Sequence, residues 1–148
     1  MADSALYQQA VLDHYRRPRN RGALADCTHA ADGSNPLCGD ALRIELRCLD
    51  ERVAELRFSG EACAIATATA SMLSSLVVDL AERDIAELGA RFERLIETGD
   101  DDASLGPLNA MRELHRYPAR RKCAMLPWAT LRAALAGTAH TTTEPESA

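Results

Sequence analysis

The stretch that decides the fold is residues 40–63, DALRIELRCLDERVAELRFSGEAC. Apolar and charged side chains alternate over residues 42–48 and again over residues 53–58, with Asp50 and Glu51 between the two runs. Strict alternation is typical of a strand buried on one face, so two such runs joined by a turn predict an antiparallel hairpin. The core face is predicted to hold Leu42, Ile44, Leu46, Cys48, Ala54, Leu56 and Phe58, and the opposite face Val53, Glu55 and Arg57.

Helical patterns surround this hairpin. Apolar residues recur at helical spacing over 4–16, 64–80, 84–97, 108–116 and 127–136, and a third strand is predicted near 29–33. These elements predict an α+β fold, a small three-stranded antiparallel sheet with helices packed on one face and loops gathered at one end. We expect one domain over residues 1–137 and a polar, disordered tail over residues 138–148.

Composition and charge exclude several classes of function. The chain has 148 residues, a net charge of −5 and no basic stripe, so nucleic acid is not expected as a partner. No stretch reaches the roughly 20 apolar residues of a membrane span, and no apolar signal region is present, so we expect a cytoplasmic protein without a membrane partner. Five cysteines, an odd number, fit a reducing compartment in which thiols act as ligands or nucleophiles.

Three of the five cysteines fall at the predicted ends of elements. Cys38 lies in the turn-forming run DGSNPLCGD (residues 32–40), Cys63 follows the second strand, and Cys123 lies in a basic segment before the last helix. Asp40 is close enough in sequence to face the same point as Cys38. Zinc accepts sulfur and oxygen ligands in tetrahedral geometry, so a site of three cysteines and one aspartate is sterically reasonable.

Such a site would be negatively charged, because three thiolates and a carboxylate outweigh the charge of one zinc ion. Arg120, Arg121 and Lys122 directly precede Cys123, and cations beside a thiolate lower its pKa. The positive end of the helix after Cys63 acts in the same way.

A plainer interpretation of the cysteines stays open. Their spacing matches none of the short-range zinc patterns, and cysteine often serves as a small buried hydrophobe. Cys48, on the core face of a predicted strand, fits that role. Cys27, two residues before His29, is interpreted as a free thiol.

Four motifs in order resemble the NifU/IscU family of iron–sulfur cluster assembly proteins. The first motif, between residues 6 and 20, consists of the pairs LY (6–7) and HY (14–15) followed by PRN (18–20). The others are NPLCGD at 35–40, FSGEAC at 58–63 and PARRKC at 118–123. The resemblance spans residues 6–135, and four ordered motifs are far more specific than one. It implies a fold of the SufE/NifU kind.

Two departures point to the SufU branch of this family. Members of the IscU kind carry a histidine directly before the third cysteine, where this chain has Lys122, and a protonated lysine cannot ligate a metal. The interval between Cys63 and Cys123 is also longer, as though the helix predicted over 84–97 and the acidic segment after it were inserted.

The resemblance implies a zinc site made by Cys38, Asp40, Cys63 and Cys123. Sulfur would come from a cysteine desulfurase of the SufS type, which carries its own pyridoxal phosphate, and would pass on to a thiol reductant or a SufB-type scaffold. By the same analogy, a histidine of the desulfurase would replace Cys38 on zinc, and the freed thiolate would accept the persulfide sulfur.

Three further residues carry two interpretations each. In a functional role, Arg120 forms an interface salt bridge or orients the persulfide. The alternative is that it is a solvated counterion to the acidic site. His14 and Tyr15 either help to dock the desulfurase or have an ordinary capping or core role.

The resemblance and these residues together leave three functions from different classes. The first is a sulfurtransferase that acts with a desulfurase, and the second is a scaffold that assembles a 2Fe-2S cluster on the same cysteines. The third is a structural zinc module, which would unfold without metal and would not affect any desulfurase.

Overall fold

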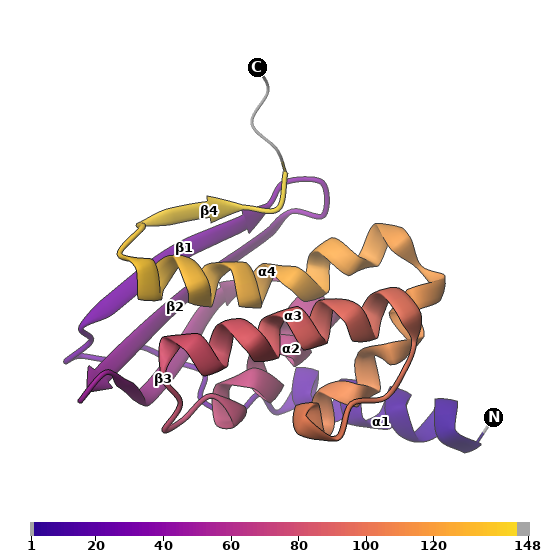
Figure 1. The fold of residues 1–148 in the computed structure, drawn as a ribbon. Helices are drawn as coiled ribbons and strands as arrows, with labels where there is room; N and C mark the ends of the chain where they lie inside the picture. Colours follow the sequence, from indigo (N-terminus) through magenta and orange to yellow (C-terminus); the bar gives the residue numbers. More distant parts are fainter. Residues whose placement is uncertain (1, 145–148) are drawn as a thin grey trace.

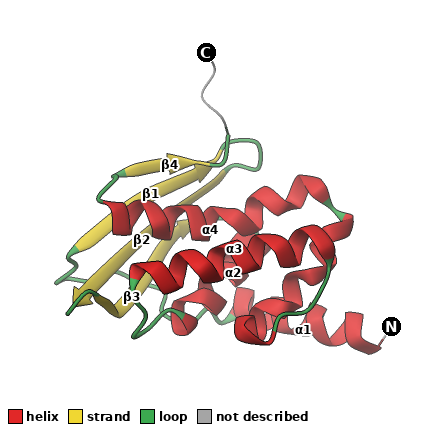
Figure 2. Ribbon diagram, viewed as in Figure 1, coloured by secondary structure: helices red, strands yellow, loops and turns green. Residues whose placement is uncertain are grey.

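The computed structural model describes residues 2–144, and the side chains from residue 8 onward. A sheet forms one layer, and helices cover one of its faces (Figures 1 and 2). The strands are β1 (His29–Asn35), β2 (Asp40–Leu49), β3 (Arg52–Glu61) and β4 (His140–Thr142), in the order β3-β2-β1-β4. The helices are α1 (Ala2–Arg16), α2 (Ala64–Leu76), α3 (Glu82–Thr98), the 3₁₀ segment η1 (Ala103–Arg116) and α4 (Pro118–Ala136). The predicted α+β class is confirmed.

The sheet is mixed, where three antiparallel strands were predicted. β2 pairs antiparallel with both β1 and β3, as predicted, but β4 adds a parallel strand at the edge of β1. The backbone N–H of Asp32 donates to Ala139 O at 2.8 Å, and that of Thr143 donates to Ser34 O at 3.0 Å. This strand lies within the segment predicted as a disordered tail, and its polar side chains gave no strand pattern because backbone pairing holds it. Residues 145–148 lie outside the described part of the chain.

The hairpin contains a bulge that changes one predicted face. The register shifts between Arg47 and Cys48, so that Arg47 pairs with Glu55 while Cys48 pairs with Val53, and Ala54 becomes the extra residue. An extra residue reverses the alternation beyond it. Val53 is therefore buried and Ala54 only half-buried, the opposite of the prediction for these two residues.

Helix α2 ends at Leu76, four residues before the predicted end. The chain then turns through Asp79, which has a positive φ of 71°. The N–H of Asp79 donates to Val53 O at 2.8 Å, and Leu80 O accepts from Val53 N at 3.0 Å. The backbone groups that would have continued the helix are thus used to join the end of α2 to the start of β3.

Helix α4 begins at Pro118, nine residues before the predicted start at Pro127. Pro118 occupies the first turn, where its missing N–H has no intrahelical partner to lose. Pro127 lies inside the helix, which removes the N–H that would bond Cys123 O one turn earlier. Cys123 is therefore a helical residue and does not lie in a segment before the last helix.

The core lies between the sheet and α2, α3 and α4. Trp128 of α4 is fully buried, and its ring centroid lies 5.8 Å from that of Phe92 in α3. Gly33 of β1 lies so close to α4 that an added Cβ would collide with Oγ1 of Thr130. This close approach brings the end of β1 beside the first turns of α4.

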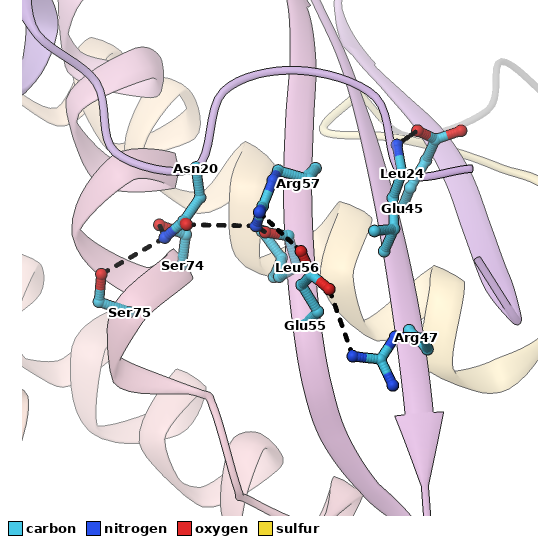
Figure 3. A network of polar contacts seen from close by, with 9 residues as sticks. All are labelled: Asn20, Leu24, Glu45, Arg47, Glu55, Leu56, Arg57, Ser74 and Ser75. Atoms are coloured by element: carbon cyan, nitrogen blue, oxygen red, sulfur yellow. Dashed lines mark hydrogen bonds and ion pairs between the residues drawn. The ribbon is translucent and has the colours of Figure 1, made fainter. Parts of the chain in front are cut away.

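A polar network fastens the segment after α1 to the sheet and to α2 (Figure 3). Asn20, at a positive φ of 62°, donates from Nδ2 to Ser74 Oγ at 2.9 Å and accepts from Arg57 at 3.3 Å. Glu55 bridges Arg57 and Arg47 on adjacent strands.

None of the described helices is both long and apolar enough to cross a bilayer.

Candidate metal centre

Four parts of the fold meet at one end of the sheet. The turn between β1 and β2 supplies Cys38, β2 begins with Asp40, α2 begins after Cys63, and α4 carries Cys123 in its second turn. The ligand atoms of Cys38, Asp40 and Cys123 all lie within 4.8 Å of one another. Sγ of Cys123 lies 3.3 Å from Sγ of Cys38. The four predicted ligands, Cys38, Asp40, Cys63 and Cys123, are called the cysteine–aspartate centre below.

Cys38 is the exposed member of this centre. It lies in a tight turn in which its N–H donates to Asn35 O at 3.1 Å and the N–H of Gly39 donates to Pro36 O at 3.4 Å. Gly39 has a positive φ of 71°, a conformation that favours glycine. The turn presents the Cys38 thiol to solvent at the edge of the centre.

Asp40 is the buried carboxylate, with 3% of its surface exposed. Its Oδ1 accepts a 2.8 Å hydrogen bond from the N–H of Cys63, whereas its Oδ2 is buried and has no hydrogen-bond partner among the described residues. A buried oxygen without a partner costs about 1–3 kcal/mol. A cation held beside Cys38 and Cys123 would satisfy this oxygen.

Cys63 caps the N-terminus of α2. Its Sγ accepts a hydrogen bond from the N–H of Ala66 at 3.4 Å, as the predicted helix start requires. Cys63 does not belong to the set of atoms within 4.8 Å of one another. Its thiol nevertheless lies close enough to Cys123 to raise the pKa of that thiol.

Cys123 is the buried thiol, with 2% of its surface exposed. Burial raises the pKa of Cys123 well above its usual range, and the neighbouring sulfurs of Cys38 and Cys63 raise it further. The side-chain amide of Asn35 donates to its Sγ at 3.6 Å. Without a cation this thiol therefore stays protonated, and a bound metal would be the group that deprotonates it.

The three basic residues before Cys123 do not lower its pKa, contrary to expectation. Lys122 forms an ion pair with Glu144, with Nζ 2.9 Å from Oε1. Arg121 donates to the backbone oxygens of Leu114 and His115. Successive helical residues point about 100° apart, so being adjacent in sequence did not bring these cations to the sulfur. At the N-terminus of α2, the N–H of Ala66 does contact the sulfur of Cys63.

Arg120 is exposed, and within the described residues its side chain has no hydrogen-bond or ion-pair partner. Tyr15 is 44% exposed, while the ring of His14 shares a 2.7 Å hydrogen bond with Oγ of Ser71. Cys27 and Cys48 are free thiols away from the centre, and Cys48 packs against the core as the plainer interpretation predicted.

Two residues make contacts in this region that the sequence did not reveal: Asn35, which contacts Cys123, and Glu144, which contacts Lys122. Asn35 was interpreted only as a turn former, although it opens the motif NPLCGD that carries Cys38 and Asp40. Glu144 lies in the polar C-terminal segment, and no pattern there links it to Lys122.

The donor set of the cysteine–aspartate centre fits a thiophilic metal. Soft thiolates favour zinc and iron–sulfur clusters, and a single carboxylate oxygen is compatible with either. The Oδ2 of Asp40, which is buried without a partner among the described residues, fits an arrangement that a positive charge completes.

The fold and the site together define the class of this protein. It is a small α+β protein with a candidate metal centre of cysteines and an aspartate where its sheet and helices meet. Over residues 6–143 the sequence matches the NifU-like N-terminal domain, and the chain belongs to that family. The resemblance seen in the four motifs is thereby confirmed.

Two relatives from this family are similar over most of their length. The zinc-dependent sulfurtransferase SufU of Bacillus subtilis is 34% identical, with 85% of this chain and 86% of that protein covered. The iron–sulfur cluster assembly scaffold protein IscU of Thermotoga maritima is 32% identical, with 91% and 96% covered. Overall identity therefore does not separate the two kinds.

A solved structure shares the fold. The crystal structure of a putative iron–sulfur cluster assembly scaffold protein for the SUF system from Fervidobacterium islandicum superposes with a TM-score of 0.81 at 25% identity, covering 88% of this chain and 97% of that one.

Proposed function

We propose that this protein is a zinc-dependent sulfurtransferase that accepts persulfide sulfur from a SufS-type cysteine desulfurase for iron–sulfur cluster assembly. One observation carries the proposal: the exposed thiol of Cys38 lies 3.3 Å from the buried thiol of Cys123, and a carboxylate oxygen of the buried Asp40 lies within 4.8 Å of both. Two buried groups suit a firmly held metal, while an exposed thiol on a turn is accessible to a partner protein.

Cys38, Asp40, Cys63 and Cys123 are the residues proposed to hold the zinc. When bound, zinc would keep the thiolates deprotonated at neutral pH and bring no redox chemistry of its own. Lys122 cannot replace the histidine found before the third cysteine of IscU-type members, because its ammonium group has no free lone pair and is held by Glu144.

Cys38 is the proposed sulfur acceptor. Its thiolate attacks the outer sulfur of the persulfide on the desulfurase. A new sulfur–sulfur bond forms at Cys38 as the bond to the enzyme's cysteine breaks, and that cysteine leaves as a thiolate. Sulfane sulfur keeps its oxidation state, so the transfer requires no outside oxidant or reductant.

Arg120 is proposed to act at the interface with the desulfurase. It lies one turn before Cys123 in α4 and is exposed without a partner among the described side chains. A guanidinium in this position is free to pair with a carboxylate of the desulfurase or to attract the anionic persulfide. Its role as a solvated counterion predicts no effect of Arg120→Ala on transfer.

Assembly of a 2Fe-2S cluster on the same cysteines is the competing function. It has the support of relatives described as scaffolds, such as the Thermotoga maritima protein. Lys122 disfavours it, since this position offers no imidazole ligand.

Alanine formation by a SufS-type desulfurase distinguishes these functions. We expect the zinc-loaded protein to stimulate the desulfurase, the chelator-stripped protein to lose this effect, and added zinc to restore it. Stimulation by the metal-free form, with inhibition by zinc, would favour the scaffold. No response to either form would favour a structural zinc module.

Variants of single cysteines give the matched control. Cys38→Ala is expected to abolish stimulation, whereas Cys48→Ala, which changes a thiol packed against the core far along β2, is expected to retain it. Mass spectrometry of the wild-type protein after one turnover should find the added sulfur on Cys38, and the product should then release it to a thiol reductant or a SufB-type scaffold.

A further inference from the structure

Asn35, the last residue of β1, is fully buried beside the cysteine–aspartate centre. Its side-chain Nδ2 donates to Sγ of Cys123 at 3.6 Å, and its Oδ1 has no hydrogen-bond partner among the described residues. The backbone oxygen of the same residue accepts the N–H of Cys38 at 3.1 Å. One residue therefore contacts the backbone of the exposed cysteine and the thiol of the buried one.

The N–H donors around the three thiols are distributed unevenly. Cys123 receives the amide of Asn35, and Cys63 receives the backbone N–H of Ala66. Within the part of the chain that the structure describes, no N–H group donates to Sγ of Cys38, whose recorded sulfur contact is the 3.3 Å one with Cys123. The thiol that faces solvent is thus the one without an N–H donor.

We propose that Asn35 is a positioning residue that keeps Cys123 as a retained ligand and leaves Cys38 as the thiolate that accepts sulfur. This inference rests on the proposed zinc-dependent transfer. An N–H donor withdraws charge from a thiolate, which makes that sulfur a poorer nucleophile and offsets the excess negative charge of the centre. Cys38, without such a donor, keeps the most reactive sulfur.

The fold holds the Asn35 amide in place. Gly33 allows β1 to lie against Thr130 of α4, on the same helix as Cys123. The pairing of Thr143 N with Ser34 O ties the end of β1 to β4. An amide at the end of a strand packed in this way aims at the helix with little freedom to rotate away.

Cobalt-substituted protein tests this role without relying on sulfur transfer. Cobalt(II) replaces zinc and gives thiolate-to-metal absorption bands whose energy reports the charge on the coordinating sulfurs. We expect Asn35→Leu, which keeps the approximate shape and removes the donor, to shift these bands to longer wavelength. Competition with a chelator is expected to show a roughly 10–100-fold weaker affinity for zinc.

Alkylation of the zinc-loaded protein reads out which thiol is released. Among the three cysteines of the centre in the wild-type protein, iodoacetamide is expected to modify Cys38 first and Cys123 last, as mapped by mass spectrometry. In Asn35→Leu the rate at Cys123 should rise several-fold while the rate at Cys38 changes little. Ser34→Ala, which alters the neighbouring residue of β1 but leaves the backbone contact with Thr143, is the matched control and should behave as wild type.

Asn35→Ala provides a second variant without the added methyl groups, and circular dichroism of both shows whether each is folded. Unchanged band positions and an unchanged order of alkylation in the folded variants would overturn the role of Asn35 and leave the proposed function standing. A wild-type protein that shows no thiolate-to-cobalt bands would instead reject the metal centre itself, and with it both proposals.

Discussion

The N–H of Cys63 donates to Oδ1 of Asp40 at 2.8 Å, so the start of α2 and the start of β2 are joined through the carboxylate of a proposed metal ligand. This bond uses one carboxylate oxygen and leaves Oδ2 buried without a partner among the residues that the structure describes. The arrangement orients Asp40 before any metal binds, because one oxygen is anchored by Cys63 and a carboxylate oxygen lies within 4.8 Å of the sulfurs of Cys38 and Cys123.

The Asp40 carboxylate is therefore expected to be essential for metal affinity. Asp40→Asn keeps the shape but replaces a charged oxygen with a neutral amide, and we expect zinc affinity to fall at least about 10-fold. Chelator competition measures the affinity, and thermal unfolding should show a smaller gain in Tm with zinc. Asp32→Asn, at a half-buried carboxylate paired with Arg43, is the control. Equal affinities for both variants would contradict the assignment of Asp40.

His14 is expected to make the stability depend on pH. Burial lowers the pKa of His14 below its ordinary value of about 6.5, and the charge of Arg19 lowers it further, while Asp13 opposes the shift. The unfolded chain therefore binds more protons than the folded one as pH falls through 6.5 toward the folded pKa, and stability decreases across that window. Above it, the neutral ring is common to both states and the penalty is absent.

Urea unfolding between pH 8 and pH 5 measures this effect. The free energy of unfolding should decline less steeply on acidification in His14→Gln than in the wild type, although the loss of the contact with Ser71 lowers stability overall. His140→Gln, at an exposed histidine, should keep the wild-type slope. A slope unchanged by His14→Gln would place the pH dependence elsewhere.

The C-terminal strand is expected to contribute to stability. Truncation after Thr138 removes the pairing of β4 with β1, the two flanking bonds from Asp32 N to Ala139 O and from Thr143 N to Ser34 O, and the exposed ion pair of Lys122 with Glu144. At about 0.5–1.5 kcal/mol for each hydrogen bond, the two flanking bonds alone should lower the free energy of unfolding by about 1–3 kcal/mol. Glu144→Gln removes the ion pair alone and should cost less than about 1 kcal/mol. A truncated protein as stable as wild type would show that β4 adds nothing to the sheet.

Gly33 is expected to tolerate no larger side chain. In Gly33→Ala the new Cβ would meet Oγ1 of Thr130 and Cδ1 of Leu126, and such overpacking costs about 1–3 kcal/mol. The double variant Gly33→Ala/Thr130→Ala removes the hydroxyl that collides, so it should be more stable than expected from the sum of the two single changes. Additive losses in chemical unfolding would mean that β1 and α4 do not touch at this point.

Much of the fold follows from local patterns in the sequence. The hairpin was predicted because side chains in a half-buried strand alternate with period two, and β2 and β3 contain the predicted runs. The start of α4 was not predicted correctly because a proline favours a helix start, whereas the helix accommodates Pro127 internally and begins at Pro118. The bulge at Ala54 was missed because a single extra residue leaves the composition of a strand unchanged.

The sequence by itself determined the α+β class, the order of the main elements, and, through four motifs, the family and the proposed ligands. Tertiary structure alone decided that Cys38 is exposed while Cys123 is buried. It also decided that Asn35 donates a hydrogen bond to Cys123 and that Glu144 forms an ion pair with Lys122. The physical reason is that alternation and helical spacing are properties of neighbouring residues. Burial, the direction of a side chain on its helix and the partners of a charge depend on segments far apart in the chain, and these meet only when the sheet and helices pack together.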